Sequence, residues 1–165
     1  MEAYYTRIFA NQSEYYLIST QKGLLFVGSP NADLKEVEKF YPDIDLIESD
    51  EFNQDAATQI IDYLNGKRDN FNLKLDIESG TKLQQEVWNN LQLIPRGTTV
   101  TYTELAKRVG HPDAVRAVAS AVGKNPLMVV IPCHRVIRKD GSVGEYRGGS
   151  AMKRRLLAME SGTKL

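Results

Sequence analysis

The chain has a single cysteine, Cys133, which follows an apolar run ending in Pro132 and precedes His134 and Arg135. A thiol acts as a nucleophile only as the thiolate, and a pKa of about 8.5 leaves only a few per cent ionised at neutral pH. A histidine base or a neighbouring cation must therefore support the reaction. These residue types favour either an activated nucleophile or an inert buried cysteine.

The apolar run at 128–131 predicts a strand that leads into the cysteine. Neighbouring side chains of an extended chain point to opposite faces, so we do not expect His134 to contact Cys133 directly. A bridging water is the expected link between the imidazole and the thiol.

A triad needs a third group that orients the histidine. The segment after Ser150 predicts a helix capped by that serine, and Glu160 falls between Leu156 and Leu157 on its apolar face. We expect Glu160 to face the core and pair with His134, with a frayed helix end in water as the alternative. Three cations are expected on the other side, open to solvent or phosphate: Lys153, Arg154 and Arg155.

Between the cysteine and this helix, the segment 141–149 contains four glycines and Tyr146. Such a composition is typical of a mobile or tightly turned loop whose backbone approaches a flat ligand, and equally of a plain surface turn. The segment lacks the Lys-Ser/Thr ending of a phosphate-binding loop.

Two short helices are predicted before the cysteine. The first spans Tyr102–Val109 and starts with a capping-box pattern, Thr101-x-x-Glu104, and the second runs from Pro112 to about Val122. Two short helices joined by a glycine-containing turn are typical of a helix-turn-helix.

The second of these helices is rich in small residues, and Arg116 is its only cation. The small residues indicate either tight packing against another helix or a helix pressed into a narrow groove, with Arg116 as the one long probe.

The N-terminal half predicts an α+β scaffold domain, residues 1–78, with no catalytic constellation. Its expected strands are Tyr4–Ala10, Glu14–Ser19, Leu24–Gly28 and Phe71–Ile77, and its expected helices are Ala32–Phe40 and Gln54–Asn65. A boundary near Ser79–Thr81 gives a second domain, residues 79–165, whose first helix is capped by Thr81 and ends before Pro95.

Composition and charge narrow the function classes. The 165 residues suit one domain or two small ones, and a single cysteine excludes an intramolecular disulfide and a multi-cysteine zinc site. Residues 1–78 carry 7 Lys/Arg and 15 Asp/Glu, and residues 79–165 carry 14 and 6, so the second half either faces a polyanion or is neutralised by the first. Without a secretory signal or a membrane-spanning run, a cytoplasmic protein is expected.

Taken together, these motifs resemble those of the O6-alkylguanine-DNA alkyltransferases, also called methylated-DNA–protein-cysteine methyltransferases. The resemblance covers about Leu83 to Ser161, and the N-terminal half matches loosely. The motifs that carry it are Ile131-Pro132-Cys133-His134-Arg135-Val136, Arg116-Ala117-Val118, Asn125-Pro126, Gly144-x-Tyr146-x-Gly148-Gly149 and Leu156-Leu157-Ala158-x-Glu160.

This resemblance implies a small ribonuclease-H-like α+β domain followed by a winged-helix, helix-turn-helix-type domain. It also implies DNA repair by direct reversal, in which an O6-alkylguanine is flipped out of duplex DNA and its alkyl group moves irreversibly to the protein's own cysteine. Each molecule would act once, as a monomer and without a cofactor or metal.

The resemblance also implies roles for individual residues. Cys133 would accept the alkyl group, His134 and Glu160 would form its water-mediated relay, Asn125 would brace the turn, and Tyr102 would rotate the nucleotide and bind the base. The DNA-binding residues would be Arg116, Tyr102, Ala117 and Ser120, with Arg116 filling the gap in the duplex. The base pocket would be formed by Tyr146, Val136, Arg147 and Gly148, with Tyr146 stacking on the guanine.

Some features depart from the family or bear on alternatives. Arg147 stands where the family often has a smaller residue, which affects access for bulky adducts. The N-terminal half has no cluster of Cys and His ligands, so the zinc of some relatives is expected to be absent, and Cys133 stands where non-reacting alkyltransferase-like proteins have Trp. The competing hypotheses are a DNA-binding module without chemistry and a Cys-His-Glu hydrolase.

Overall fold

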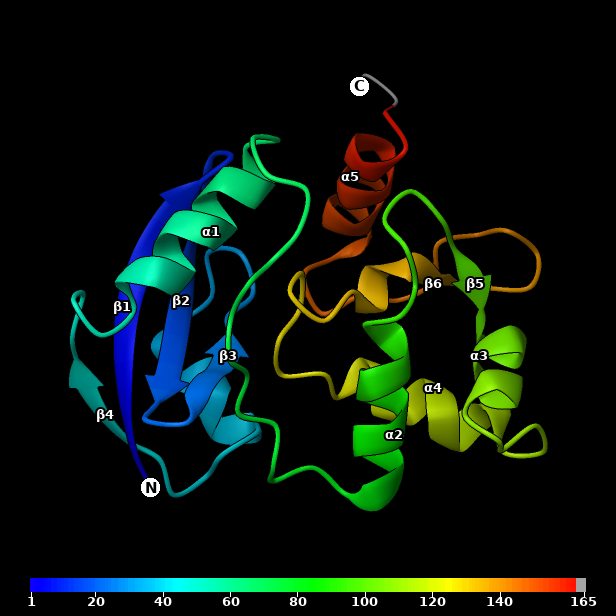
Figure 1. The fold of residues 1–165 in the computed structure, drawn as a ribbon, viewed down its shortest axis with the longest axis horizontal. Helices are drawn as coiled ribbons and strands as arrows, with labels where there is room; N and C mark the ends of the chain where they lie inside the picture. The colour runs from blue at the N-terminus through cyan, green and yellow to red at the C-terminus, as the bar shows by residue number, and fades with distance from the viewer. Residues whose placement is uncertain (163–165) are drawn as a thin grey trace. The chain divides into compact units, whose positions relative to one another are not determined.

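The computed structural model describes residues 1–162. The chain divides into two compact units, the first from Met1 to Ile77 and the second starting at Glu78 (Figure 1). The sequence-based limits, 1–78 for a scaffold domain and 79–165 for a DNA-binding and alkyl-acceptor domain, stay a prediction.

The first unit is a four-stranded sheet with a helix packed on one face. Its strands are β1 (Glu2–Ala10), β2 (Ser13–Thr20), β3 (Gly23–Val27) and β4 (Asp45–Glu48), in the order β3-β2-β1-β4. The first three are antiparallel neighbours, and β4 pairs parallel to β1. Helix α1 (Gln54–Leu64) contacts β1 and buries Ile60 and Leu64, which are one helical turn apart.

Two elements of this unit differ from the prediction. The expected helix Ala32–Phe40 is a 3-10 helix, η1 (Leu34–Lys39), capped by Asp33. The expected strand Phe71–Ile77 is wrong, because this segment meets the edge of the sheet only at an isolated bridge between Leu75 and Leu24. An alternating apolar pattern predicts which side chains turn inward, but a strand also needs a continuous partner, and β3 offers this segment a partner only at Leu24.

In the part of the second unit that the structure describes, there are four α-helices, a short 3-10 helix and a two-stranded parallel sheet. The helices are α2 (Lys82–Leu91), α3 (Tyr102–Arg108), α4 (Val115–Gly123) and α5 (Ser150–Glu160). The strands are β5 (Val100–Thr101) and β6 (Val136–Ile137). α4 packs on α2 and α3, and the indole Nε1 of Trp88 on α2 donates to the carbonyl of Ala121 on α4 at 2.9 Å.

At the starts of these helices, local sequence signals predicted some boundaries correctly and one wrongly. The predicted capping box at Thr101 and Glu104 is present, and Thr81 caps α2 in the same way, with Gln84 as its partner. The predicted start of the next helix at Pro112 is wrong. The chain first makes a turn, in which the N–H of Ala114 donates to the carbonyl of His111, so α4 begins only at Val115.

Among the described residues, no helix is both long enough and apolar enough to cross a membrane.

Candidate active site

Cys133 is presented by a tight turn rather than by a strand. The predicted strand at 128–131 is wrong because the chain turns back on itself, with the N–H of Ile131 donating to the carbonyl of Leu127 at 2.8 Å. Val129 has a φ of 74°, a left-handed conformation that β-branched residues rarely adopt. The turn is therefore imposed by its surroundings and not by the local preference of apolar residues.

Asn125 is the side chain that closes this turn. Its Nδ2 donates to the carbonyl of Ile131 at 2.8 Å, and its Oδ1 accepts from the N–H of Leu127 at 2.9 Å. The residue is only 2% exposed, so no solvent could replace these two bonds.

We expect Asn125→Ala to lower the free energy of unfolding by about 2–4 kcal/mol, because it leaves the buried N–H of Leu127 without its partner and removes one of the two hydrogen bonds to the carbonyl of Ile131. Urea denaturation measures this change. Asn90→Ala is the matched control, because Asn90 makes one hydrogen bond, within α2, and its loss is expected to cost about 0.5 kcal/mol or less. Equal losses in both variants would contradict a bracing role.

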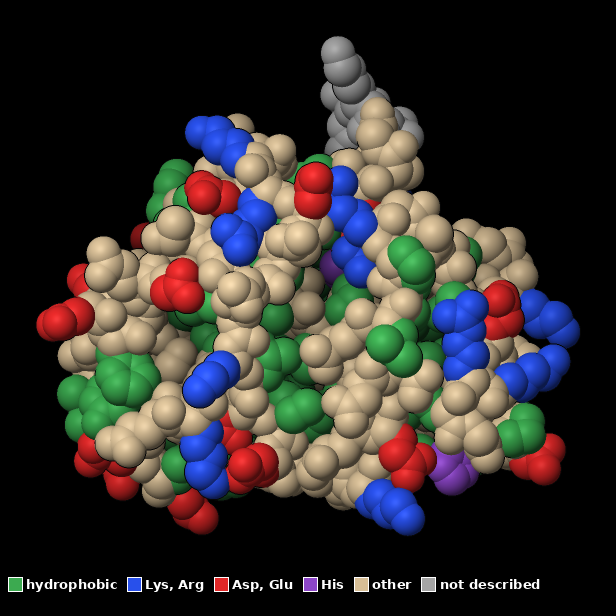
Figure 2. Space-filling model, viewed as in Figure 1, with side chains coloured by type: hydrophobic (Ala, Val, Ile, Leu, Met, Phe, Trp, Pro, Cys, Tyr) green, Lys and Arg blue, Asp and Glu red, His purple; other side chains and the backbone are tan. Residues whose placement is uncertain are grey.

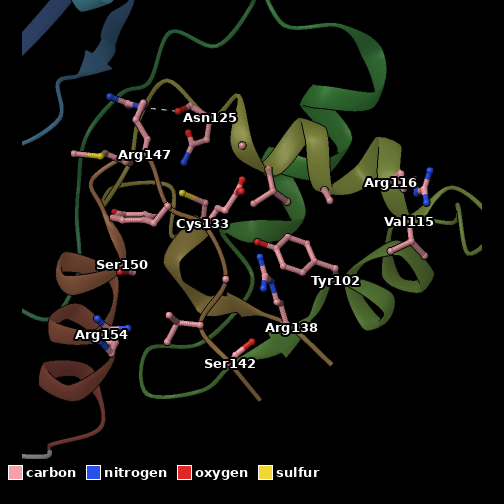
Figure 3. Close-up of a pocket in the computed structure, with 18 of the residues that line it drawn as sticks. Tyr102, Val115, Arg116, Asn125, Cys133, Arg138, Ser142, Arg147, Ser150 and Arg154 are labelled. Atoms are coloured by element: carbon pink, nitrogen blue, oxygen red, sulfur yellow. Dashed lines mark hydrogen bonds between the residues drawn. The ribbon is translucent and has the colours of Figure 1, made fainter. Parts of the chain in front are cut away.

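Cys133 opens a short 3-10 turn, η2 (Cys133–Arg135), and its N–H donates to the carbonyl of Ile131 at 2.7 Å. The residue is 8% exposed and lines an open cavity of about 1650 Å³ (Figure 3). Further side chains in the cavity wall come from α3, α4 and the loop after β6, and include Tyr102, Arg116, Arg138 and Tyr146. The thiol is thus buried in the protein, yet it faces a space that a ligand can enter.

Behind the thiol lies a buried network in which Glu160 is the centre. Nε2 of His134 lies 2.7 Å from Oε2 of Glu160, and both side chains are inaccessible to solvent. The guanidinium of Arg135 donates through Nε to Oε1 and through Nη2 to Oε2 of the same carboxylate, each at 2.9 Å, and through Nη1 to the carbonyl of Ile94. The inward position expected for Glu160 and its pairing with His134 are both present, and Arg135 joins them.

This network determines the tautomer of His134. An ionised carboxylate only accepts hydrogen bonds, so Nε2 carries the proton that it donates to Glu160. Burial lowers the pKa of His134 below its usual value, against the opposing effect of Glu160, and keeps the imidazole neutral. Nδ1 is buried and has no hydrogen-bond partner among the described residues, so its lone pair is available to take a proton.

The charge state of the thiol is a balance between burial and nearby polar groups. Burial raises the pKa of Cys133, while a hydrogen bond from Asn125 and the positive charges of Arg147 and Lys153 lower it. The expected solvent-facing position of Lys153 is wrong, since this residue is 0% exposed. Burial lowers the pKa of Lys153 to about 8.

Tyr102, the first residue of α3, lies in the cavity wall and is half-buried. Burial raises the pKa of its phenol, so at neutral pH the hydroxyl keeps its proton and can donate a hydrogen bond.

Helix α4 has a buried face and an exposed face. Val118, Ala121 and Val122 are buried, as tight packing requires. Arg116, Ala117 and Ser120 are exposed, which leaves a flat face with one long cation.

Comparison with known proteins agrees with this geometry. Residues 14–77 match the ribonuclease-like domain of 6-O-methylguanine DNA methyltransferase, and residues 82–162 match the DNA binding domain of the same family. The inducible methylated-DNA–protein-cysteine methyltransferase of Bacillus subtilis is 42% identical over 161 residues, which cover 95% of this chain and 89% of that protein. The chain belongs to the 6-O-methylguanine DNA methyltransferase family.

Solved structures of family members extend the similarity to the fold. The O6-methylguanine methyltransferase of Mycobacterium tuberculosis has a TM-score of 0.81 and 32% sequence identity, over 99% of this chain and 95% of that one. A crystal structure from the same organism, in complex with DNA, has a TM-score of 0.80 and 30% identity, over 98% of this chain and 94% of the other. The two-domain architecture is that of the methyltransferase family.

Of the four residues expected to form the base pocket of this methyltransferase, Tyr146 and Arg147 line the cavity, whereas Val136 and Gly148 do not. A Cβ at Gly148 would lie 2.5 Å from Sδ of Met152 and 2.9 Å from the ring of Tyr146, so both side chains would have to shift to admit a larger residue. The N–H of Val136 already donates to the carbonyl of Cys133, so this N–H is not available to a ligand. Nη2 of Arg147 reaches back to the carbonyls of the turn after α4 (Figure 3).

The expected cap of α5 is wrong. Gly149, with a φ of 95°, occupies the N-cap position, and Ser150 is the first helical residue. Glycine at this position allows the loop to turn sharply into the helix.

Sequence reasoning missed two features of the site, the pairing of Arg135 with Glu160 and the burial of Lys153. Arg135 directly follows His134, and the buried Glu160 needs a cation as partner, so adjacency was a usable signal. Lys153 lies seven residues before Glu160, which is two turns of helix and therefore the same face. The charge of Lys153 favours a position in solvent, but its spacing from Glu160 along the helix indicates burial.

No group of three or more potential metal ligands occurs within the part of the chain that the structure describes.

Proposed function

We propose that this protein repairs DNA by direct reversal, transferring the alkyl group of an O6-alkylguanine in duplex DNA irreversibly to Cys133. The observation that carries the proposal is the position of the thiol. It lines a cavity that also contains Tyr102 and Arg116, and it lies beside the neutral His134 that is held by Glu160. The chain belongs to a family of methyltransferases that act on DNA, and a thiol that faces an open cavity is suited to accept a methyl group.

Reaching this thiol requires the guanine to leave the duplex. A stacked base cannot enter a cavity inside the protein, so the nucleotide has to rotate outward at a cost of a few kcal/mol. Arg116 on the exposed face of α4 would fill the vacated space, with Ala117 and Ser120 allowing the helix to approach the minor groove closely. Tyr102 would assist the rotation from the cavity wall.

In the proposed step the bond from Sγ to the alkyl carbon forms while the bond from that carbon to O6 breaks. The thiol proton passes through a water to Nδ1 of His134, and Glu160 stabilises the resulting imidazolium. The electron pair of the broken bond stays on the purine, which takes a proton from the hydroxyl of Tyr102. The thioether is stable, so each molecule acts once.

The same cavity would hold the extruded base. Tyr146 would stack on the purine, since both are flat and the ring lies in the wall that contains Cys133. The backbones of Cys133, Val136 and Arg147 would recognise the edge of the base, and Gly148 would leave room beside it.

Charge supports a nucleic-acid partner. Residues 79–165 carry 14 Lys/Arg against 6 Asp/Glu, and Figure 2 shows basic side chains gathered around α3 and the loop after β6. We further propose that the protein acts as a monomer in the cytoplasm.

Intact mass after mixing with a duplex that contains O6-methylguanine tests this function. The proposal requires a stoichiometric gain of one methylene on the peptide that contains Cys133, without turnover. Binding to DNA without a mass gain would instead support a DNA-binding module without chemistry. The absence of both DNA binding and a mass gain would support the Cys-His-Glu hydrolase.

We expect Arg116→Ala to weaken binding to lesion-containing duplex by ~1–3 kcal/mol, because the gap left by the flipped base is no longer filled. Fluorescence anisotropy measures the affinity, and stopped-flow measures the transfer rate. Arg116→Lys is the control: it keeps the phosphate attraction and its salt dependence but loses the planar group. Unchanged transfer in Arg116→Ala would remove this residue from the mechanism.

A further inference from the structure

The loop between β6 and α5 is attached to the rest of the second unit by cations on two sides. Nζ of Lys153, on α5, donates to the carbonyl of Glu145 at 3.3 Å. Nη2 of Arg147 reaches the carbonyls of Pro126 and Asn125 at 3.2 Å and 3.4 Å. The segment between these attachments contains Tyr146, which lines the cavity beside the thiol.

We propose that Lys153 and Arg147 form a cationic clamp, a pair of positioning residues that fixes the segment 145–147 over the cavity and stabilises the Cys133 thiolate from two sides. This inference rests on the proposed function, because it assigns the clamp to the acceptor of that reaction.

The burial of Lys153 is the first argument. Its side chain is fully excluded from solvent, and within the described part of the chain its one hydrogen bond goes to the carbonyl of Glu145. An ammonium group has three donors, and a buried charge is costly unless another charge or dipole compensates it. A thiolate at Cys133 supplies such a charge, and it raises the pKa of Lys153 against the effect of burial.

The surroundings of the thiol are the second argument. The charged and titratable side chains that share the cavity wall with the thiol are Tyr102 of α3, Arg116 of α4, Arg138, Glu145 and Arg147 of the loop, and Arg154 of α5. His134 lies in the same turn, with Glu160 and Arg135 behind it. Lys153, the buried neighbour of Arg154 on α5, is not part of that wall. Glu160 is already paired with Arg135 and His134. Two cations, Arg147 and Lys153, lower the pKa of the thiol by their charge.

The geometry makes the two effects inseparable in the native protein. The hydrogen bonds that hold the loop come from the same two side chains that bring positive charge to the sulfur. A loop that lifted away would take the charge of Arg147 with it, so the nucleophile is most ionised when the wall of the base pocket is in place.

The test measures the pH profile of Cys133 alkylation by iodoacetamide, which needs no DNA. We expect Lys153→Met and Arg147→Gln each to move the midpoint of the profile upward by about one pH unit and to slow alkylation at pH 7 by about tenfold. Arg155→Gln removes an exposed cation two residues along α5 from Lys153 and is expected to leave the midpoint unchanged.

Arg147→Lys separates charge from position. This variant keeps the charge but not the planar group that reaches the two carbonyls, so we expect a wild-type midpoint with a slower transfer from O6-methylguanine duplex. Lys153→Met could fail to fold, which circular dichroism would detect, and Arg147→Gln then decides the question. A wild-type midpoint in folded variants that lack the charge would overturn the clamp.

Failure of the clamp and failure of the proposed function give different results. A wild-type protein that reacts with iodoacetamide but takes no methyl group from DNA would overturn the function alone. Normal transfer from DNA together with an unchanged midpoint in Arg147→Gln and Lys153→Met would overturn the clamp alone.

Discussion

Cys133→Ala is expected to abolish methyl transfer completely while leaving the affinity for duplex DNA nearly unchanged. The chain has one cysteine, so no other thiol can accept the alkyl group. The side chains proposed to contact DNA lie on the exposed face of α4 and at the first residue of α3, and they do not include the sulfur. Intact mass measures transfer, and fluorescence anisotropy with the lesion duplex measures binding.

Cys133→Ser is the matched variant, since it keeps the size of the side chain. A hydroxyl is far less acidic than a thiol, and neutral His134 cannot ionise it to a useful extent, so this variant is also expected to be inactive. Loss of a methyl group from the DNA in the presence of either variant would show that the acceptor has been wrongly assigned.

Glu160→Gln is expected to lower the free energy of unfolding by about 3–5 kcal/mol, because it leaves the buried cation of Arg135 without its counter-charge. The amide that replaces the carboxylate has one accepting oxygen and an NH2 group that faces other donors. The orientation of His134 is lost with it, so transfer by the folded fraction is expected to fall by roughly 10²-fold.

Urea denaturation and single-turnover transfer below the unfolding transition separate these two effects. Glu145→Gln, at an exposed carboxylate of the same unit, is the control and should change stability by about 0.5 kcal/mol or less. If Glu160→Gln is destabilised but transfers the methyl group at the normal rate, Glu160 acts only as a structural partner of Arg135 and not in the transfer. A normal stability would contradict the buried network itself.

Local sequence signals were sufficient where the interaction is local. The cap at Thr81 and the capping box at Thr101 lie within one helical turn of the residues they bond, so a local pattern predicts them directly. Helical spacing also placed Glu160 on the inner face of α5, because that face is defined by Leu156 one turn earlier.

Contacts outside a segment decided the elements where prediction was wrong. The apolar residues around Val129 favour a strand by composition, yet hydrogen bonds from the side chain of Asn125, just before the segment, hold them in a turn. The alternating segment Phe71–Ile77 has the pattern of a strand but meets β3, far away in the sequence, only at Leu24. In both places propensity describes a short stretch of chain, while the group that pairs with it lies outside that stretch.

The sequence by itself determined the reactive residue types, the family and the paired histidine and glutamate. Only the tertiary structure decided the electrostatic surroundings of the sulfur. These are the burial of Lys153, the hydrogen bond from Arg147 to the turn after α4, and the hydrogen bonds from Arg135 to Glu160 and to the carbonyl of Ile94. A pattern along the chain gives the direction of a side chain. The free energy of a charge depends on the burial and the counter-charges that other segments bring to it.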